Sequence, residues 1–98
     1  MSTRQFFLYI LASWTGVLYV GVTSQLARRL AQHRTKVPGS FTARYNVHRL
    51  VYCEVFPEAA LAIRREREIK KWRREKKVAL IRAQNPGWKD LAAEWRLD

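Results

Sequence analysis

The chain has 98 residues, 48% of them hydrophobic, which is enough for one small domain with a buried core and excludes a chain that is disordered by composition. Nineteen Lys and Arg against eight Asp and Glu give a formal net charge of +11, which is typical of a protein that binds a polyanion. Apolar runs are too short for a membrane-spanning helix or a signal peptide, and Cys53 has no second cysteine to pair with. We therefore expect a cytoplasmic protein that binds nucleic acid rather than a membrane.

Two runs rich in aromatic and β-branched residues, Gln5–Ala12 and Val17–Thr23, come first and predict a β-hairpin. Tyr9 and Tyr19 lie on one face of this hairpin if its loop has an odd number of residues, and on opposite faces if the loop has two. Tyrosines in strands are more often core residues than catalytic ones, but their hydroxyls need partners when buried. Gly21 permits another element or a ligand to approach the backbone closely.

A helix is predicted over Gln25–Thr35, with Ser24 as its N-cap. At 100° per residue, Arg29 and His33 fall on the same face as the leucines that mark the inward side of this helix. An arginine in that position either reaches water at the edge of the core or binds a ligand. The helix alone favours neither alternative.

A loop is predicted at Lys36–Arg44 and a third strand at His48–Phe56. Two helices are predicted at Glu58–Arg74 and Glu75–Ala83, followed by a final turn or two at Trp88–Trp95. The third strand is nearly apolar throughout, which favours a central position in a sheet. The order β-β-α-β-α-α predicts an α+β fold in which helices pack on a three-stranded sheet made of the hairpin and this central strand. We expect one domain over residues 1–98, with its core between about residues 5 and 92.

Glu66 interrupts the apolar stripe of the long helix, whereas Glu68 lies almost on the opposite side. The stripe is marked by Ala59, Ala62, Ile63 and Ile69. A carboxylate on a buried stripe needs a cation, a metal ion or several hydrogen bonds, or else it takes up a proton. Two alternatives follow: Glu66 forms a structural salt bridge with Arg29, or it borders a cavity and holds a metal ion.

Basic side chains are dense from Arg64 to Lys77, with Trp72 among them. Such a run is either a solvated helix face or a surface that follows phosphates, and the net charge favours the second alternative. Trp72 and Trp88 are candidates for stacking on an unpaired base, although packing in the core is the commoner fate of such residues. The candidate nucleic-acid-binding residues are Arg28, Arg44, Lys70, Lys71 and Arg74.

Several short motifs follow one another along the chain: Leu8-Tyr9-Ile10, Tyr19-Val20-Gly21, Arg29 and His33 at eight and twelve residues after Gly21, Phe41–Tyr45, Arg49–Tyr52, Arg65-Glu66, Ile69–Trp72 and Asn85–Trp88. In this order they resemble the GIY-YIG nuclease superfamily, and specifically its small stand-alone members of the YhbQ type. The resemblance extends from about Phe6 to Leu91. Leu8 stands where the first motif has glycine and Val20 where the second has isoleucine, but both motifs keep their tyrosines.

The resemblance implies a nuclease in which Glu66 binds one Mg²⁺ or Mn²⁺ ion. It assigns Tyr9 as general base or water-positioning group, and Tyr19 as support for Tyr9 or for the attacking water. It assigns Arg29 as the ligand of the scissile phosphate and His33 as an aid to proton transfer or a DNA contact. Tyr45 is a further candidate for the tyrosine roles. A phenol with its ordinary pKa near 10 is a poor base at pH 7, so a tyrosine base requires the metal or Arg29 to lower its pKa.

The predicted function is that of a metal-dependent endonuclease that hydrolyses phosphodiester bonds in DNA without a small-molecule cofactor. A chain this small has little surface for reading bases, so we expect selectivity for DNA structure or low sequence specificity. The main alternative is a non-catalytic nucleic-acid-binding module on the same fold, and a weaker one is a basic scaffold for an acidic protein. Replacing Glu66 separates the first two, because only the enzyme loses an activity.

Overall fold

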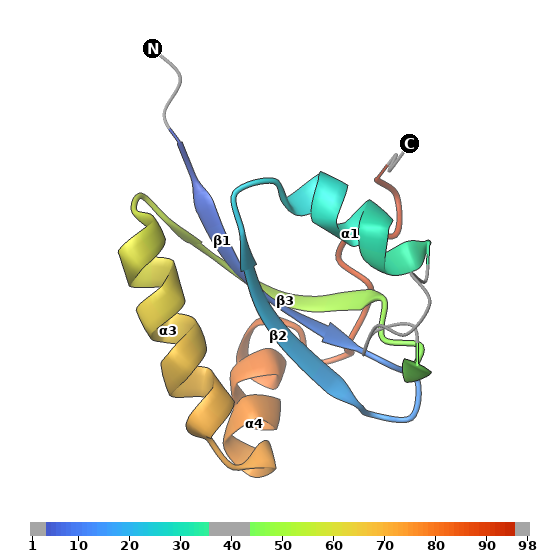
Figure 1. The fold of residues 1–98 in the computed structure, drawn as a ribbon. Coiled ribbons are helices and arrows are strands. Elements are labelled where there is room, and N and C mark those ends of the chain that lie inside the picture. Colours follow the sequence, from blue (N-terminus) through green and yellow to red (C-terminus); the bar gives the residue numbers. More distant parts are fainter. Residues whose placement is uncertain (1–3, 36–43, 96–98) are drawn as a thin grey trace.

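The computed structural model describes residues 4–35 and 44–95, and within them a three-stranded antiparallel sheet carries helices on both faces (Figure 1). The elements are β1 (Phe6–Ala12), β2 (Leu18–Thr23), α1 (Leu26–Arg34), β3 (Arg49–Phe56), α3 (Ala59–Lys71) and α4 (Arg74–Gln84). The predicted α+β order is confirmed. None of the helices within these ranges combines the length and the apolarity that crossing a membrane would demand.

The hairpin of β1 and β2 has a five-residue loop, residues 13–17, and its odd length puts both tyrosines on one face. Tyr9 pairs with Gly21, and Tyr19 pairs with Leu11, so the tyrosines are diagonal neighbours. The loop closes through a 2.9 Å hydrogen bond from the Ser13 amide to the Val17 carbonyl oxygen. The sequence left open which face each tyrosine occupies, and the loop length decides it.

The strand order is β2-β1-β3, so the predicted central position of β3 is wrong: β1 is the central strand. The apolar first half of β3 is nonetheless buried, because the C-terminal segment covers its outer edge. The Leu91 amide donates to the Leu50 carbonyl oxygen at 2.8 Å, and the Leu50 amide donates to Oδ1 of Asp90 at 3.2 Å. An edge strand whose outer edge is covered in this way can have the nearly continuous apolar sequence that is typical of a central strand.

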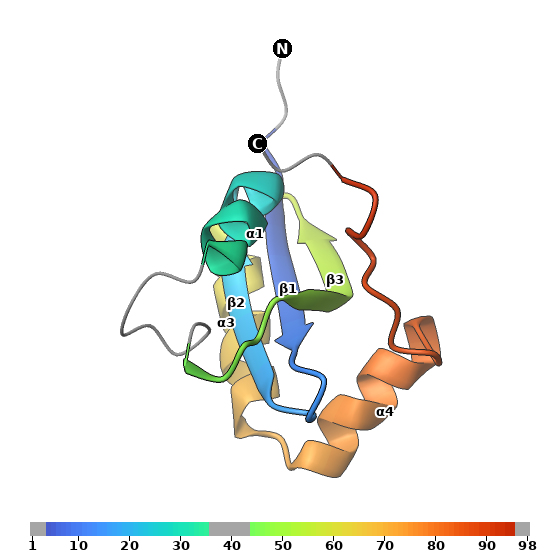
Figure 2. The ribbon, with the colours of Figure 1, turned by 90° about the vertical axis from the view of Figure 1, so that its right-hand side faces the viewer.

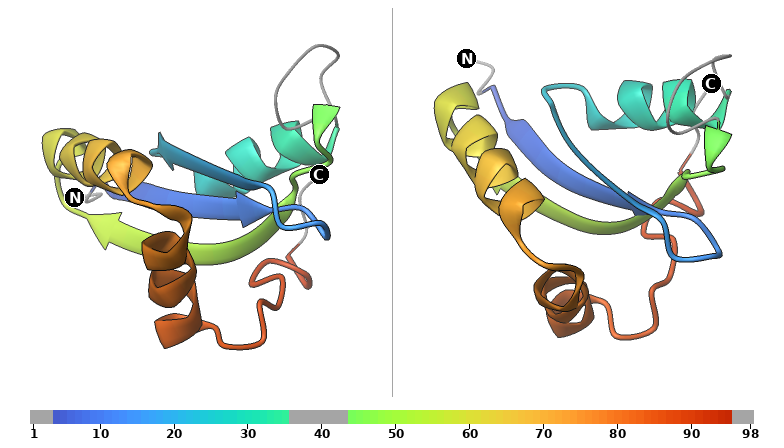
Figure 3. Two further views of the ribbon diagram at one scale, coloured as in Figure 1. Left: turned by 90° about the horizontal axis from the view of Figure 1, so that it is seen from below. Right: turned by 60° about the horizontal axis from the view of Figure 1, so that its bottom comes forward.

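Each face of the sheet carries its own hydrophobic cluster. Leu26 and Leu30 of α1 pack on one face with Tyr9 and Leu11, while α3 and α4 cover the other face. Views from the side and from below show α1 and α4 on opposite sides of the curved sheet (Figures 2 and 3). The predicted inward face of α1 is confirmed, and this face brings Arg29 and His33 towards the tyrosines.

Element boundaries agree with the sequence to within a few residues, with one capping error. The N-cap of α1 is Gln25 and not Ser24, and it makes no side-chain capping bond. Instead, the Gln25 amide donates to Oγ1 of Thr23 at 3.0 Å. The segment Trp88–Trp95 contains a turn at residues 91–94, in agreement with the predicted turn or two. The predicted loop Lys36–Arg44 lies outside the described residues except for Arg44.

Candidate active site

Four of the predicted catalytic side chains lie together between β1, β2 and α1, and we call them the tyrosine–histidine cluster: Tyr9, Tyr19, Arg29 and His33. The Tyr9 hydroxyl lies 3.1 Å from Nε2 of His33, and Nε of Arg29 donates to the same hydroxyl at 3.4 Å. The Tyr19 and His33 rings meet edge to face, with centroids 5.2 Å apart. The cluster therefore joins residues far apart in the chain into one contact group.

Gly21 makes room for this cluster. A Cβ built on Gly21 would lie 2.6 Å from both Cζ and the hydroxyl oxygen of Tyr9, and 3.0 Å from Cε1 of Tyr19. Real Cβ atoms do not approach other atoms this closely, so the Tyr9 ring lies directly over the bare backbone of Gly21. Tyr9 is therefore the residue that approaches the backbone of Gly21 closely.

Burial controls the protonation of the cluster. Burial, aided by the positive charge of Arg29, lowers the pKa of His33 from 6.5 to about 4, so this imidazole is neutral at pH 7. Burial raises the pKa of Tyr9 to about 12, against the opposing effect of its hydrogen bond from Arg29. The Tyr9 hydroxyl accepts from Arg29, and the direction of its hydrogen bond with Nε2 of the neutral His33 depends on which ring nitrogen carries the proton.

The pKa of Tyr9 therefore moves opposite to the direction that a tyrosine base requires. Its side chain is also fully buried, at 0% exposure, so water does not reach it directly. Tyr19 is only half-buried, and Arg29 is exposed. Tyr9 is placed to hold Arg29 and His33 in position, and Tyr19 and Arg29 are the members of the cluster that reach solvent.

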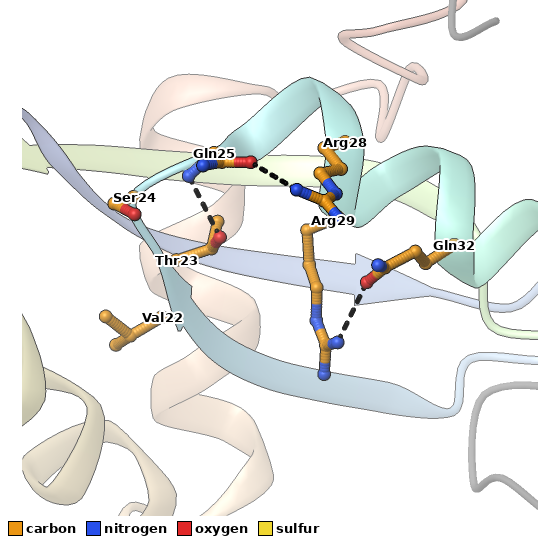
Figure 4. A pocket seen from close by; sticks show the side chains of 7 residues that line it. All are labelled: Val22, Thr23, Ser24, Gln25, Arg28, Arg29 and Gln32. Carbon is orange, nitrogen blue, oxygen red and sulfur yellow. Dashed lines mark hydrogen bonds between the residues drawn. The ribbon is translucent and has the colours of Figure 1, made fainter.

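A pocket of about 290 Å³ opens beside the exposed part of Arg29, at the junction of β2 and α1 (Figure 4). Nη1 of Arg29 donates to Oε1 of Gln32 at 3.0 Å, and Nη1 of Arg28 donates to Oε1 of Gln25 at 3.3 Å. The sequence did not single out the two glutamines, although each lies three residues from its arginine on one helix face. The lining residues are Val22, Thr23, Ser24, Gln25, Arg28, Arg29 and Gln32, two cations and no carboxylate.

Glu66 has a different environment from the cluster. Its side chain is 22% exposed, and Oε1 lies 3.6 Å from Nζ of Lys70, one turn further along α3. The predicted alternative of a structural salt bridge with Arg29 is wrong, because Lys70 is the ion-pair partner. Ala62 and Ile69 are buried as the stripe predicted, but Ile63 is 40% exposed, so the apolar stripe is narrower than expected.

The remaining candidate nucleic-acid contacts are spread over the molecule. Lys70, Lys71 and Arg74 belong to helices on the face of the sheet opposite α1, and all three are exposed. Tyr45 is 41% exposed, and the guanidinium of Arg44 lies 5.5 Å from its ring centroid. Of the candidate binding residues, Arg28 lines the pocket beside the cluster.

The described residues contain no group of three His, Cys, Asp or Glu side chains that could enclose a metal ion. Glu66 offers a single carboxylate, which is partly exposed and forms an ion pair with the exposed Lys70. This donor set fits a hard cation such as Mg²⁺, which keeps several waters and takes oxygen ligands from one carboxylate and a phosphate. It does not fit a metal such as Zn²⁺, which needs several protein ligands.

The fold and the cluster agree with the comparison to known proteins. The family model described as the GIY-YIG catalytic domain matches residues 5–79, a range that includes the tyrosine–histidine cluster and Glu66. The chain therefore belongs to the GIY-YIG family, a superfamily of nucleases.

Its similar relatives carry the name UPF0213 protein. One from Desulfotalea psychrophila is 35% identical over 86 residues, covering 84% of this chain and 76% of the relative. One from Staphylococcus aureus is 36% identical over 77 residues, covering 78% and 93%. The solution NMR structure of a UPF0213 protein from Bacillus halodurans superimposes with a TM-score of 0.58 at 27% identity, covering 92% of this chain and 97% of that one.

Proposed function

We propose that the protein is an endonuclease that hydrolyses phosphodiester bonds in DNA, with one Mg²⁺ or Mn²⁺ ion held by Glu66. The observation that carries the proposal is the position of Arg29. Its Nε is hydrogen-bonded to a fully buried phenol, while its side chain lines an open pocket that contains a second arginine. A guanidinium fixed at one end and exposed at the other is well suited to bind a phosphate.

The residue roles differ from the simplest assignment. Burial raises the pKa of Tyr9 to about 12, so its phenol is protonated at pH 7, and its side chain is fully buried. It therefore acts as a positioning residue for Arg29 and His33. Tyr19 is the tyrosine that reaches solvent, and we assign it to orienting the attacking water. His33 is neutral at pH 7, and its hydrogen bond with the Tyr9 hydroxyl holds the phenol oxygen within reach of Arg29.

A divalent ion, when bound, would supply Lewis-acid stabilisation of the charge that develops on the phosphate. Glu66 would hold it through a carboxylate oxygen in place of the ion pair with Lys70. Lys70, whose side chain is 54% exposed, would then be free to turn towards a phosphate. The basic surface of α3 and α4 supplies sequence-independent affinity, so we expect structure-selective cutting or low sequence specificity.

The test is a cleavage screen with Mg²⁺ and with Mn²⁺ on single-stranded, duplex, flap and branched DNA, comparing wild type with Glu66→Ala. We expect Glu66→Ala to lower the cleavage rate by at least about a hundredfold, a few kcal/mol of transition-state stabilisation, and to change DNA affinity less than about twofold. Glu68→Ala is the matched control, since Glu68 is 53% exposed on the same helix and pairs with Arg65. It should cut like wild type.

A non-catalytic nucleic-acid-binding module remains the second candidate, because the ion pair with Lys70 gives Glu66 a structural role. This candidate predicts that wild type cuts none of these DNA forms with either ion. It also predicts that Glu66→Ala changes only the thermal stability, by the small amount typical of an exposed i,i+4 pair.

A further inference from the structure

The loop of the hairpin, residues 13–17, presents an exposed tryptophan at the end of β2 opposite Val22 and Thr23, which line the pocket. Trp14 is 75% exposed, whereas Trp72 and Trp88, the stacking candidates in the sequence, are partly buried against the core under α3 and α4. A single exposed aromatic side chain is common on protein surfaces and implies nothing by itself. The surroundings of Trp14 give it significance.

One face of the Trp14 indole is covered by a fixed cation. The Cζ atom of Arg49 lies 4.0 Å from the ring centroid. This guanidinium is held by hydrogen bonds to the carbonyl oxygens of Ser13 at 3.0 Å and Trp88 at 3.1 Å, and Arg49 is only 9% exposed. Its Nε is buried and has no hydrogen-bond partner. The buried cation therefore fixes one face of the indole, and the ring's high exposure leaves other parts of it to solvent.

The loop that carries Trp14 is itself well ordered. Oγ of Ser13 accepts from the Val17 amide at 2.9 Å and is bonded to Oγ1 of Thr15 at 2.9 Å. The Gly16 amide donates to the Ser13 carbonyl oxygen at 3.2 Å, with Gly16 at a φ of 93°. An aromatic ring on a loop fixed in this way loses little conformational entropy when a ligand stacks on it.

A second cation lies beside the same loop. The start of α4 lies near this loop (Figure 2). Nη2 of Arg74, the first residue of α4, is 2.8 Å from the position of a Cβ on Gly16, and Arg74 is exposed. An exposed ring with a fixed cation beneath it and an exposed cation beside its loop matches a nucleotide, whose base stacks while its phosphate pairs with the arginine. The net charge of +11 favours nucleic acid, a polyanion, over a neutral ligand.

We propose that Trp14, supported by Arg49 and flanked by Arg74, is a stacking site for an unpaired base of the bound nucleic acid. The site rests on the nucleic-acid binding in the proposed function, and it defines a substrate class: nucleic acid that contains a single-stranded segment. The six residues of β2 separate Trp14 from the pocket by about 20 Å. At 3.4 Å per nucleotide this corresponds to about six stacked nucleotides, so a 15-nucleotide strand reaches both sites.

The test measures affinity by fluorescence anisotropy in EDTA, where no cutting occurs, for a 15-nucleotide oligo(dT) and a fully paired 15-base-pair duplex. We expect Trp14→Ala to weaken oligo(dT) binding by about tenfold and duplex binding by less than about twofold, since stacking needs an unpaired base. Trp14→Tyr should keep most of the affinity for oligo(dT). Trp95→Ala, which removes a tryptophan that is 43% exposed elsewhere, should change neither affinity.

Two further arms identify the contact. An abasic 15-mer should bind wild type and Trp14→Ala equally, because the partner of the ring is missing. Oligo(U) should respond to Trp14→Ala as oligo(dT) does, since every base has a stacking face. A Trp14→Ala protein that binds oligo(dT) within twofold of wild type, or that loses duplex and single-strand affinity equally, would overturn the proposal. Absence of cleavage in the metal screen would reject the nuclease but leave this result standing.

Discussion

The phenol oxygen of Tyr9 lies 3.1 Å from Nε2 of His33, in a contact that fastens the central strand β1 to helix α1. Neither side chain is more than 7% exposed. The pair shares its hydroxyl with Arg29, whose other end reaches solvent. Arg29 lines the pocket, so the position of this pocket-lining side chain depends on the buried pair.

Removing the Tyr9 hydroxyl tests this dependence. Tyr9→Phe keeps the ring over Gly21 but leaves Nε2 of His33 and Nε of Arg29 without their shared partner. We expect the free energy of unfolding to fall by about 1–2 kcal/mol, because the buried Nε2 of His33 loses its hydrogen bond to Tyr9. Urea denaturation measures the change. Tyr45→Phe, at a tyrosine that is 41% exposed, should stay within about 0.5 kcal/mol of wild type.

Acid should destabilise the protein through His33. Its pKa is about 4 in the folded chain and 6.5 as an ordinary histidine, so between these values the unfolded chain takes up a proton that the folded chain does not. Stability is therefore fully present above pH 6.5 and is lost as pH falls towards 4, by up to about 3 kcal/mol. Comparing urea midpoints of wild type and His33→Gln from pH 7 to pH 4 isolates this contribution. Equal slopes for the two proteins would show that His33 is not the group responsible.

Gly21 should tolerate no side chain. A methyl group at this position would lie 2.6 Å from the Tyr9 ring, which is packed on all sides. We expect Gly21→Ala to lower the free energy of unfolding by about 1–3 kcal/mol and to displace Tyr9. Gly87→Ala is the matched control, because its nearest side-chain neighbour is Lys89 at 3.9 Å. Thermal denaturation of the two variants measures their loss of stability. Equal losses for Gly21→Ala and Gly87→Ala would contradict the close packing of Tyr9 on Gly21.

Arg29 should be sensitive even to a change that keeps its charge. Arg29→Lys removes the Nε donor to Tyr9 and the planar donor pair for phosphate. We expect single-turnover cleavage to fall by about 10- to 100-fold, corresponding to about 1.4–2.7 kcal/mol. Arg82→Lys, an exposed change on α4, should cut like wild type. A similar rate for Arg29→Lys and wild type would mean that Arg29 acts only as a positive charge.

The sequence by itself determined the local elements and the faces they present. Runs of aromatic and β-branched residues predict the hairpin, and helical periodicity puts Arg29 and His33 on the inward side of α1, whereas the shared face of Tyr9 and Tyr19 follows from the loop length in the structure. These features depend on interactions between near neighbours in the chain, for which the residue spacing is sufficient information.

Only the tertiary structure decided the features that depend on distant segments. The sequence of β3 is typical of a central strand, yet β3 is an edge strand. Residues from the C-terminal segment form hydrogen bonds with its outer edge and cover it, so its side chains can be apolar. Burial under α1 raises the pKa of Tyr9 although an arginine donates to it. The sequence does not show that Arg49, 35 positions after Trp14, lies against one face of the Trp14 ring. Trp14 becomes a candidate stacking residue only through this contact. Burial, desolvation and contact between remote residues exist only in the folded chain, so spacing along the sequence does not determine them.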